Sequence, residues 1–199
     1  MNRNSSIELL RVFAMMMILI LHANFFSVHI PSAEECISSS SFSLSRFILC
    51  GLSITGVDIF IFISGYFGIR TNVRKFSNII FQFLFYSIAL TVISAIFGFG
   101  SGFSIRNLAS AIFLTSDFWF VKSYLILFLL APALNYYVEN TSKKELEWIV
   151  IGFIIFQCIY GWIGSVADFN DGFSALAFVG IYLLARYLGK YPVNITINK

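Results

Sequence analysis

Residues 7–26 read IELLRVFAMMMILILHANFF, an apolar run of the length that a membrane-crossing helix requires. The hydrocarbon core of a bilayer is about 30 Å thick, so a helix that rises about 1.5 Å per residue needs about 20 mostly apolar residues. Backbone polar groups inside lipid must bond within the segment itself, and a helix achieves this. The stretch therefore predicts a membrane-spanning helix near the start of the chain.

The rest of the chain has the same character. Of its 199 residues, 58% are hydrophobic and 12% are charged, whereas soluble domains carry about 25% charged residues. Six apolar runs are long enough to span a bilayer, and short polar connections separate them. The predicted spans are 8–28, 46–67, 76–98, 118–138, 147–165 and 172–189. We therefore expect an all-α, polytopic transmembrane bundle that forms a single domain over residues 1–199, with a short interfacial helix near 105–114.

The basic residues predict the orientation of these spans. With the N-terminus in the cytoplasm, ten of the thirteen basic residues lie at or near that face, as the positive-inside rule requires. These ten are Arg3, Arg11, Arg70, Arg74, Lys75, Lys143, Lys144, Arg186, Lys190 and Lys199. The other three, Arg46, Arg106 and Lys122, fall on the opposite side. Six spans then return the C-terminus to the cytoplasm. Basic residues dispersed in this way do not indicate a nucleic-acid partner.

The first span contains ionisable residues, which are costly in a membrane and mark functional sites by default. Arg11 and His22 are eleven residues apart, so at about 100° per residue they share one helix face, about 16 Å apart along the axis. Glu8 joins this face as an i,i+3 neighbour of Arg11. Two interpretations stay open: interfacial anchors with a helix–helix hydrogen bond at His22, or an imidazole that transfers protons.

A further ionisable residue, Asp58, lies in GVDIFIFISGYF (residues 56–67), away from both ends of the second span. A carboxylate at that depth must face other helices and find a partner there. His22 and Arg11, on the preceding helix, are the candidates. Asp58 is either a structural residue that fixes helix register or a group that orients or charges His22.

Arg70, Arg74 and Lys75 crowd the cytoplasmic end of the second span. A basic cluster there is typical of a topology signal. It also suits a phosphate-bearing donor such as coenzyme A, because guanidinium groups match phosphate geometry. The three cysteines (Cys36, Cys50 and Cys158) have no metal-ligand spacing, so we expect no metal site.

Four motifs, in order along the chain, resemble membrane acyltransferase family 3, the bacterial O-acyltransferases that modify surface polysaccharides. The first motif is Arg11 followed by His22, and the second is GVDIFIFISGYF with the basic residues that come after it. The third is FWFVKSYLILFLLAPALN (residues 118–135), and the fourth is DGFSALAFVGIYLLARYLGKY (residues 171–191). The resemblance covers all six predicted spans. The usual family member has about ten spans, so the chain resembles only the N-terminal six-helix portion of the family.

The resemblance implies transfer of an acyl group, usually acetyl, from cytoplasmic acyl-coenzyme A to a sugar hydroxyl. The acceptor would be an envelope glycan or lipid-linked sugar at the bacterial cytoplasmic membrane. His22 matches the family's essential histidine and Arg11 its arginine partner, while Arg70, Arg74 and Lys75 match the basic loop implicated in donor use. A neutral imidazole would deprotonate the hydroxyl, and a covalent acyl-histidine is the alternative.

Two other functions stay open from the sequence. A small proton-coupled transporter would use Glu8, His22 and Asp58 as a relay. Paired repeats are typical of transporters, and the sequence shows no internal repeat. An inactive, shortened remnant of the acyltransferase would insert in the membrane without catalysis.

Overall fold

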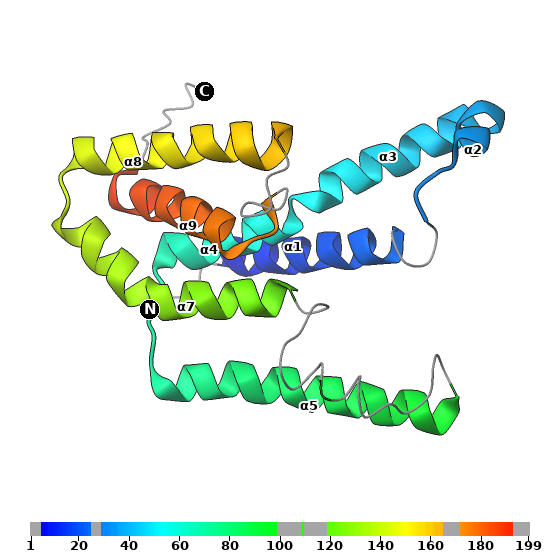
Figure 1. Cartoon of the computed structure of the whole chain (residues 1–199), viewed down its shortest axis with the longest axis horizontal. Coiled ribbons are helices and arrows are strands. Elements are labelled where there is room, and N and C mark those ends of the chain that lie inside the picture. The colour runs from blue at the N-terminus through cyan, green and yellow to red at the C-terminus, as the bar shows by residue number, and fades with distance from the viewer. Residues whose placement is uncertain (1–4, 25–28, 99–108, 110–118, 165–171, 193–199) are drawn as a thin grey trace. The chain divides into compact units, whose positions relative to one another are not determined.

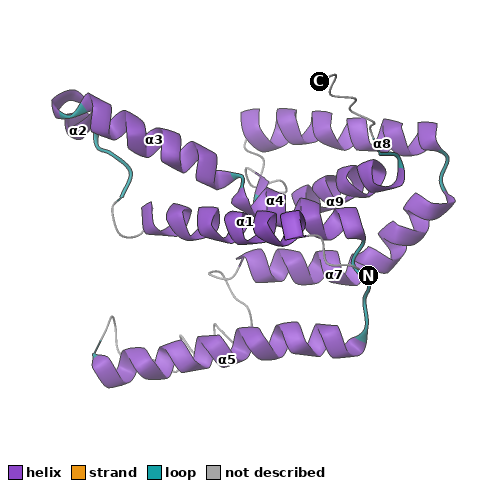
Figure 2. Cartoon of the chain, turned by 180° about the vertical axis from the view of Figure 1, so that it is seen from behind, coloured by secondary structure: helices purple, strands orange, loops and turns teal. Residues whose placement is uncertain are grey.

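The computed structural model describes residues 5–24, 29–98, 109, 119–164 and 172–192. Throughout these ranges the regular elements are helices and none is a strand, which confirms the predicted all-α class (Figures 1 and 2). The chain divides into two compact units, residues 1–67 and residues 68–199, and each is described by itself.

The described residues of the first unit form four helices. They are α1 (Ser5–Ala23), α2 (Ala33–Ser38), α3 (Ser40–Ile54) and α4 (Gly56–Phe67). Thr55 separates α3 from α4, and its hydroxyl donates to the Leu52 carbonyl at 3.0 Å. Together α3 and α4 cover the second predicted span, residues 46–67. Their helical segment begins six residues earlier, at Ser40.

Helix α1 packs antiparallel to α3 and α4, beside both in the two views (Figures 1 and 2). Near the end of α1, the Asn24 amide donates to the Arg46 carbonyl of α3 at 3.4 Å. Near the middle, Gly56 of α4 lies so close to α1 that a Cβ there would stand 3.0 Å from the Ala14 carbonyl oxygen. Glycine therefore lets the backbones approach, as small residues do in membrane helix pairs.

Five helical elements lie in the described part of the second unit. They are α5 (Val73–Phe97), α7 (Trp119–Asn140), α8 (Lys143–Phe156), the π-helix η3 (Gln157–Ile163) and α9 (Ala175–Lys190). Helices α5 and α8 begin with side-chain caps from Asn72 and Ser142, and α9 begins with one from Ser174. These caps satisfy backbone N–H groups that have no partner within their helix.

Helices α7 and α9 run parallel, because the start of α7 contacts the start of α9 and the end of α7 contacts the end of α9. At the start, the Trp119 ring lies 6.2 Å from that of Phe178, and at the end Lys190 Nζ donates to the Val138 carbonyl at 2.6 Å. Helix α8 packs on α9 in the opposite direction, since Phe153 faces Gly180. Alternating directions of this kind are what successive membrane crossings require.

Four helical segments of the described chain are long and apolar enough to cross a membrane: 5–23, 40–67, 73–97 and 119–140. They match the first four predicted spans. Helix α8 with η3 covers 143–163 and α9 covers 175–190, so the last two predicted spans are helical and their crossing stays a prediction. The predicted interfacial helix near 105–114 lies outside the described residues.

Helix α5 buries none of its residues in the second unit, and side chains such as Phe81 are 67% exposed. An apolar surface of this extent is the ordinary state of a helix that faces lipid. We conclude that the chain is a multi-pass membrane protein.

Candidate active site

Helix α1 carries the three ionisable residues that the sequence placed on one face. The Arg11 guanidinium donates to Glu8 Oε1 across 3.0 Å, which confirms the expected i,i+3 pair. The helix is continuous from Ser5 to Ala23, so Arg11 and His22 keep the shared face that their spacing predicts.

The His22 ring is held by its own helix. Its Nδ1 atom lies 2.8 Å from the Ile18 carbonyl oxygen. A carbonyl only accepts hydrogen bonds, so this contact requires a hydrogen on Nδ1. In the neutral ring the lone pair then resides on Nε2, the nitrogen with which an imidazole accepts a proton. The Ile18 backbone thus sets the tautomer.

The face with Arg11 and His22 borders the packing surface of α1. The buried residues of α1 are Ala14, Met17 and Leu21, whereas His22 is exposed within the first unit. At about 100° per residue, Arg11 and His22 stand roughly a quarter turn from the centre of that buried stripe. Helices α3 and α4 therefore support this face from the side and leave the His22 ring accessible.

Asp58 lies in the first turn of α4, two residues beyond the close approach of Gly56 to Ala14, Met17 and Ile18. Because α1 and α4 are antiparallel, Asp58 lies opposite the middle of α1. Along the axis of α1, this level is roughly 12 Å from His22 and about one turn from Arg11. A carboxylate in a first turn is also favoured by the helix dipole. Asp58 stays a predicted site residue, at a level closer to Arg11 than to His22.

The predicted donor-binding residues Arg70, Arg74 and Lys75 lie between the end of α4 and the first turn of α5, a segment that we call the basic connection. Gly68 turns the chain with a φ of 73°, in the left-handed region that glycine enters without strain. Asn72 Oδ1 accepts from the Lys75 backbone N–H at 2.7 Å and starts α5, while Lys75 Nζ donates to the Arg70 carbonyl at 3.0 Å. Arg70, Arg74 and Lys75 are exposed, and the structure brings them together around the first turn of α5.

Two further cations lie at the ends of α7 and α9. Arg186 Nη2 lies 3.6 Å from Glu139 Oε1. Lys190 Nζ donates to the Val138 carbonyl at 2.6 Å and to the Glu139 and Thr141 carbonyls at 3.3 Å each. Lys190 therefore caps the last turn of α7, whose carbonyls have no partner within the helix.

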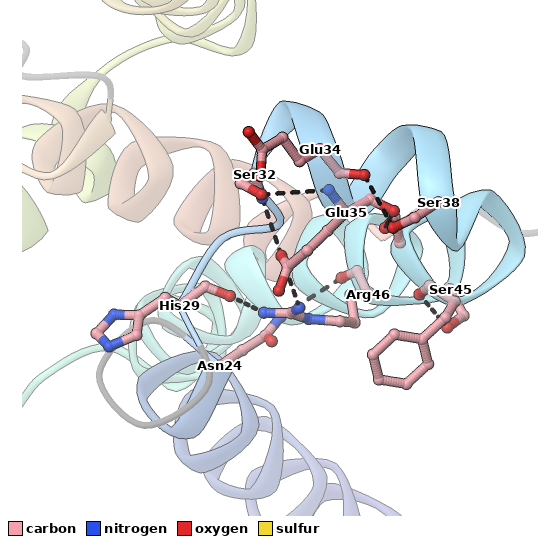
Figure 3. A network of polar contacts seen from close by, with 10 residues as sticks. Asn24, His29, Ser32, Glu34, Glu35, Ser38, Ser45 and Arg46 are labelled. Atoms are coloured by element: carbon pink, nitrogen blue, oxygen red, sulfur yellow. Dashed lines mark hydrogen bonds and ion pairs between the residues drawn. The ribbon is translucent and has the colours of Figure 1, made fainter.

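In the first unit, a polar cluster surrounds Arg46 of α3, near the end of α1 that carries His22 (Figure 3). Arg46 is 8% exposed; its Nη2 donates to the His29 carbonyl and its Nη1 lies 3.6 Å from Glu35 Oε2. Its own carbonyl accepts from Asn24, two residues beyond His22. The guanidinium thus ties α2 and the segment before it to α3, while the Arg46 backbone carbonyl joins α3 to Asn24 at the end of α1.

Comparison with protein families shows to which group these features belong. A family model described as an acyltransferase domain matches residues 4–199. The chain belongs to acyltransferase family 3. The match spans both units of the chain, so the Arg11–His22 helix and the basic connection both lie inside the family domain. Comparisons with curated proteins and with solved structures each found no match.

Sequence reasoning missed two features of the chain. It treated residues 32–41 as a polar connection, but Ser32 and Glu35 form a capping box that begins α2. The Ser-x-x-Glu pattern is the signal that would have revealed it. It also placed Arg46 at the outer boundary of a span, whereas α3 begins at Ser40 and buries Arg46 inside the unit.

Replacing Arg46 by leucine should destabilise this end of the first unit. The variant loses the hydrogen bond to the His29 carbonyl and the ion pair with Glu35, at a cost of about 1–3 kcal/mol for a charge-assisted contact. We expect a lower melting temperature in detergent. Ser45→Ala is the matched control, because Ser45 Oγ donates only to Phe42 of its own helix at 2.7 Å. Equal melting temperatures for the two variants would contradict a tethering role.

Proposed function

We propose that this family member is an O-acyltransferase that uses cytoplasmic acyl-coenzyme A, with acetyl as the usual acyl group. The acceptor is a hydroxyl of a cell-envelope glycan or lipid-linked sugar at the bacterial cytoplasmic membrane. The family match supports acyl transfer, and the observation that carries the donor assignment is the cation cluster at the start of α5.

That cluster lies where positive charge is least favourable for the helix. The N-terminus of a helix already has the positive end of the macrodipole, so Arg74 and Lys75 in the first turn of α5 add like charge to it. Arg70 precedes the same turn. A bound phosphate would relieve this repulsion and accept hydrogen bonds from the guanidinium groups. Coenzyme A has phosphates of this kind and carries the acyl group as a thioester.

The acyl transfer itself is proposed to use His22. The sugar hydroxyl attacks the thioester carbonyl while His22 Nε2 accepts its proton, and the Ile18 carbonyl holds the ring in the required tautomer. The C–S bond then breaks, and the leaving thiolate takes the proton back from the imidazolium. An acyl group carried transiently on the imidazole is the alternative.

Arg11 and Asp58 are proposed to support this step rather than to contact the reacting carbonyl. Arg11 is three turns from His22 along α1 and already holds Glu8, which suits the positioning of α1 or a contact with the donor. Asp58, about one turn from the level of Arg11, would add negative charge near that guanidinium.

Sealed membrane vesicles test the proposal, because acyl-coenzyme A does not cross a bilayer. Inside-out vesicles that contain the full chain and its acceptor glycan should transfer label from external radioactive acetyl-coenzyme A to the glycan. Right-side-out vesicles should not. Neutralising both Arg70 and Arg74 with glutamine should raise KM for the donor about tenfold or more, since a hydrogen bond to a charged group contributes about 1.5–3 kcal/mol.

Lys144→Gln is the matched control for the two arginine substitutions. Lys144 is also basic and exposed, but it lies at the start of α8 rather than on the connection before α5. Transfer that is equal from both faces, or a donor KM that changes as much in the control as in the arginine variant, would contradict the proposed donor site.

A further inference from the structure

Two side chains of the second unit hold the backbone of Ile69, the residue immediately before Arg70. The Tyr182 hydroxyl of α9 accepts a hydrogen bond from the Ile69 N–H at 3.0 Å. The Asn135 amide of α7 donates to the Ile69 carbonyl at 3.0 Å. The Tyr182 hydroxyl donates in turn to Asn135 Oδ1 at 2.8 Å. Three residues therefore form a closed ring of hydrogen bonds.

The ring of hydrogen bonds is buried, so each of its polar groups needs a hydrogen-bond partner. Tyr182 is 0% exposed and is among the largest fully buried side chains of the described chain. A buried hydroxyl or backbone group without a partner is costly, and here every polar group of the ring finds one. The contacts reach only the main chain of residue 69, so they fix its position whatever its side chain is.

Gly68 brings Ile69 to this place. Its left-handed turn directs the chain toward α7 and α9 directly after α4 ends. A Cβ on Gly68 would meet Arg186 Nη1 at 3.0 Å and Asn135 Oδ1 at 3.5 Å, so the turn fits closely against the same two helices. The position of Arg70, the next cation, follows from the position of Ile69.

We propose that Tyr182 and Asn135 are positioning residues that hold the basic connection in the geometry that binds the donor phosphates. This inference rests on the proposed function. The two side chains do not contact the donor; they determine where Arg70 stands, and Asn72 then sets where α5 and Arg74 begin. Nothing in the sequence motifs assigns this role to either residue.

Tyr182→Phe tests the proposal with the full-length protein in detergent. Phenylalanine keeps the packing of the ring and removes the hydroxyl that serves both Ile69 and Asn135. We expect faster hydrogen exchange at the Ile69 amide, together with an acetyl-coenzyme A affinity that is about five- to tenfold weaker by calorimetry, the effect of one or two lost hydrogen bonds. In the transfer assay, donor KM should rise while kcat stays close to the original value.

Tyr187→Phe is the matched control, because Tyr187 lies in the same helix and its ring packs on that of Tyr191 at 5.5 Å. It should change neither exchange at Ile69 nor donor affinity. A second variant, Asn135→Leu, removes the other half of the ring at similar size and should reproduce the Tyr182→Phe result.

The outcomes separate this inference from the proposed function. If the unmodified protein binds no acetyl-coenzyme A, the proposed function fails and the positioning role fails with it. If it binds, but Tyr182→Phe leaves the affinity and the donor KM unchanged, only the positioning role is overturned. Faster exchange at Ile69 without a change in affinity would overturn it equally, since the ring would then be structural alone.

Discussion

Replacing His22 by alanine is expected to abolish acyl transfer while the protein still inserts and folds. His22 is exposed within its unit, and its Nδ1 bonds to the Ile18 carbonyl of its own helix, so replacing the ring leaves no cavity. A positioned general base contributes about 10²- to 10⁴-fold to the rate, and we expect a loss in that range. The measurement is the transfer of labelled acetyl to glycan by membranes that contain equal amounts of protein.

The second histidine provides the control for this prediction. His29 is also exposed, and its backbone carbonyl rather than its ring accepts the hydrogen bond from Arg46. His29→Ala keeps that carbonyl and should therefore retain transfer. Transfer by His22→Ala within a few-fold of the original rate would contradict the assignment of His22 as the base or as the acyl carrier.

The second large effect is expected at Gly68. Valine there would adopt a positive φ that a β-branched residue avoids, at a cost of about 1–3 kcal/mol, and its Cβ would press on the Arg186 guanidinium. The turn would open and withdraw Ile69 from Tyr182 and Asn135. We expect both a lower melting temperature and a loss of donor affinity of about tenfold or more, since two hydrogen bonds to Ile69 are broken.

Gly152→Val separates this effect from the general cost of replacing glycine in the same unit. Gly152 lies inside α8, and a Cβ there would meet nothing within 4 Å. Valine in that open helical position should leave melting temperature and donor affinity nearly unchanged. A Gly68→Val protein that behaves like this control would show that the turn does not need its left-handed conformation.

The apolar runs predicted the helices well because length and hydrophobicity are local properties. Residues 5–23, 73–97 and 119–140 lie within a few residues of the predicted spans. The helix that contains the second predicted span begins six residues earlier, at Ser40, because serines add little hydropathy but can still lie in a helix. In the structure such serines bond to carbonyls of their own helix, as Ser45 does with Phe42, and the helix continues through them.

The candidate site was predictable only where it depends on spacing along one helix. The shared face of Arg11 and His22 and the Glu8 pair follow from helical periodicity alone. The ring around Ile69 joins residues 66 and 113 positions apart, and no local pattern indicates such partners. The level of Asp58 likewise depends on the register between α1 and α4, which Gly56 sets through close packing.

The contacts of Lys190 also have a consequence for the order in which the protein is assembled. The three carbonyls at the corner between α7 and α8 receive their donor from a residue synthesised 49 to 52 positions later. Until α9 is synthesised and packed, those oxygens cannot receive this donor. A chain that stops before residue 190 would therefore leave the three carbonyls without the bonds that Lys190 supplies.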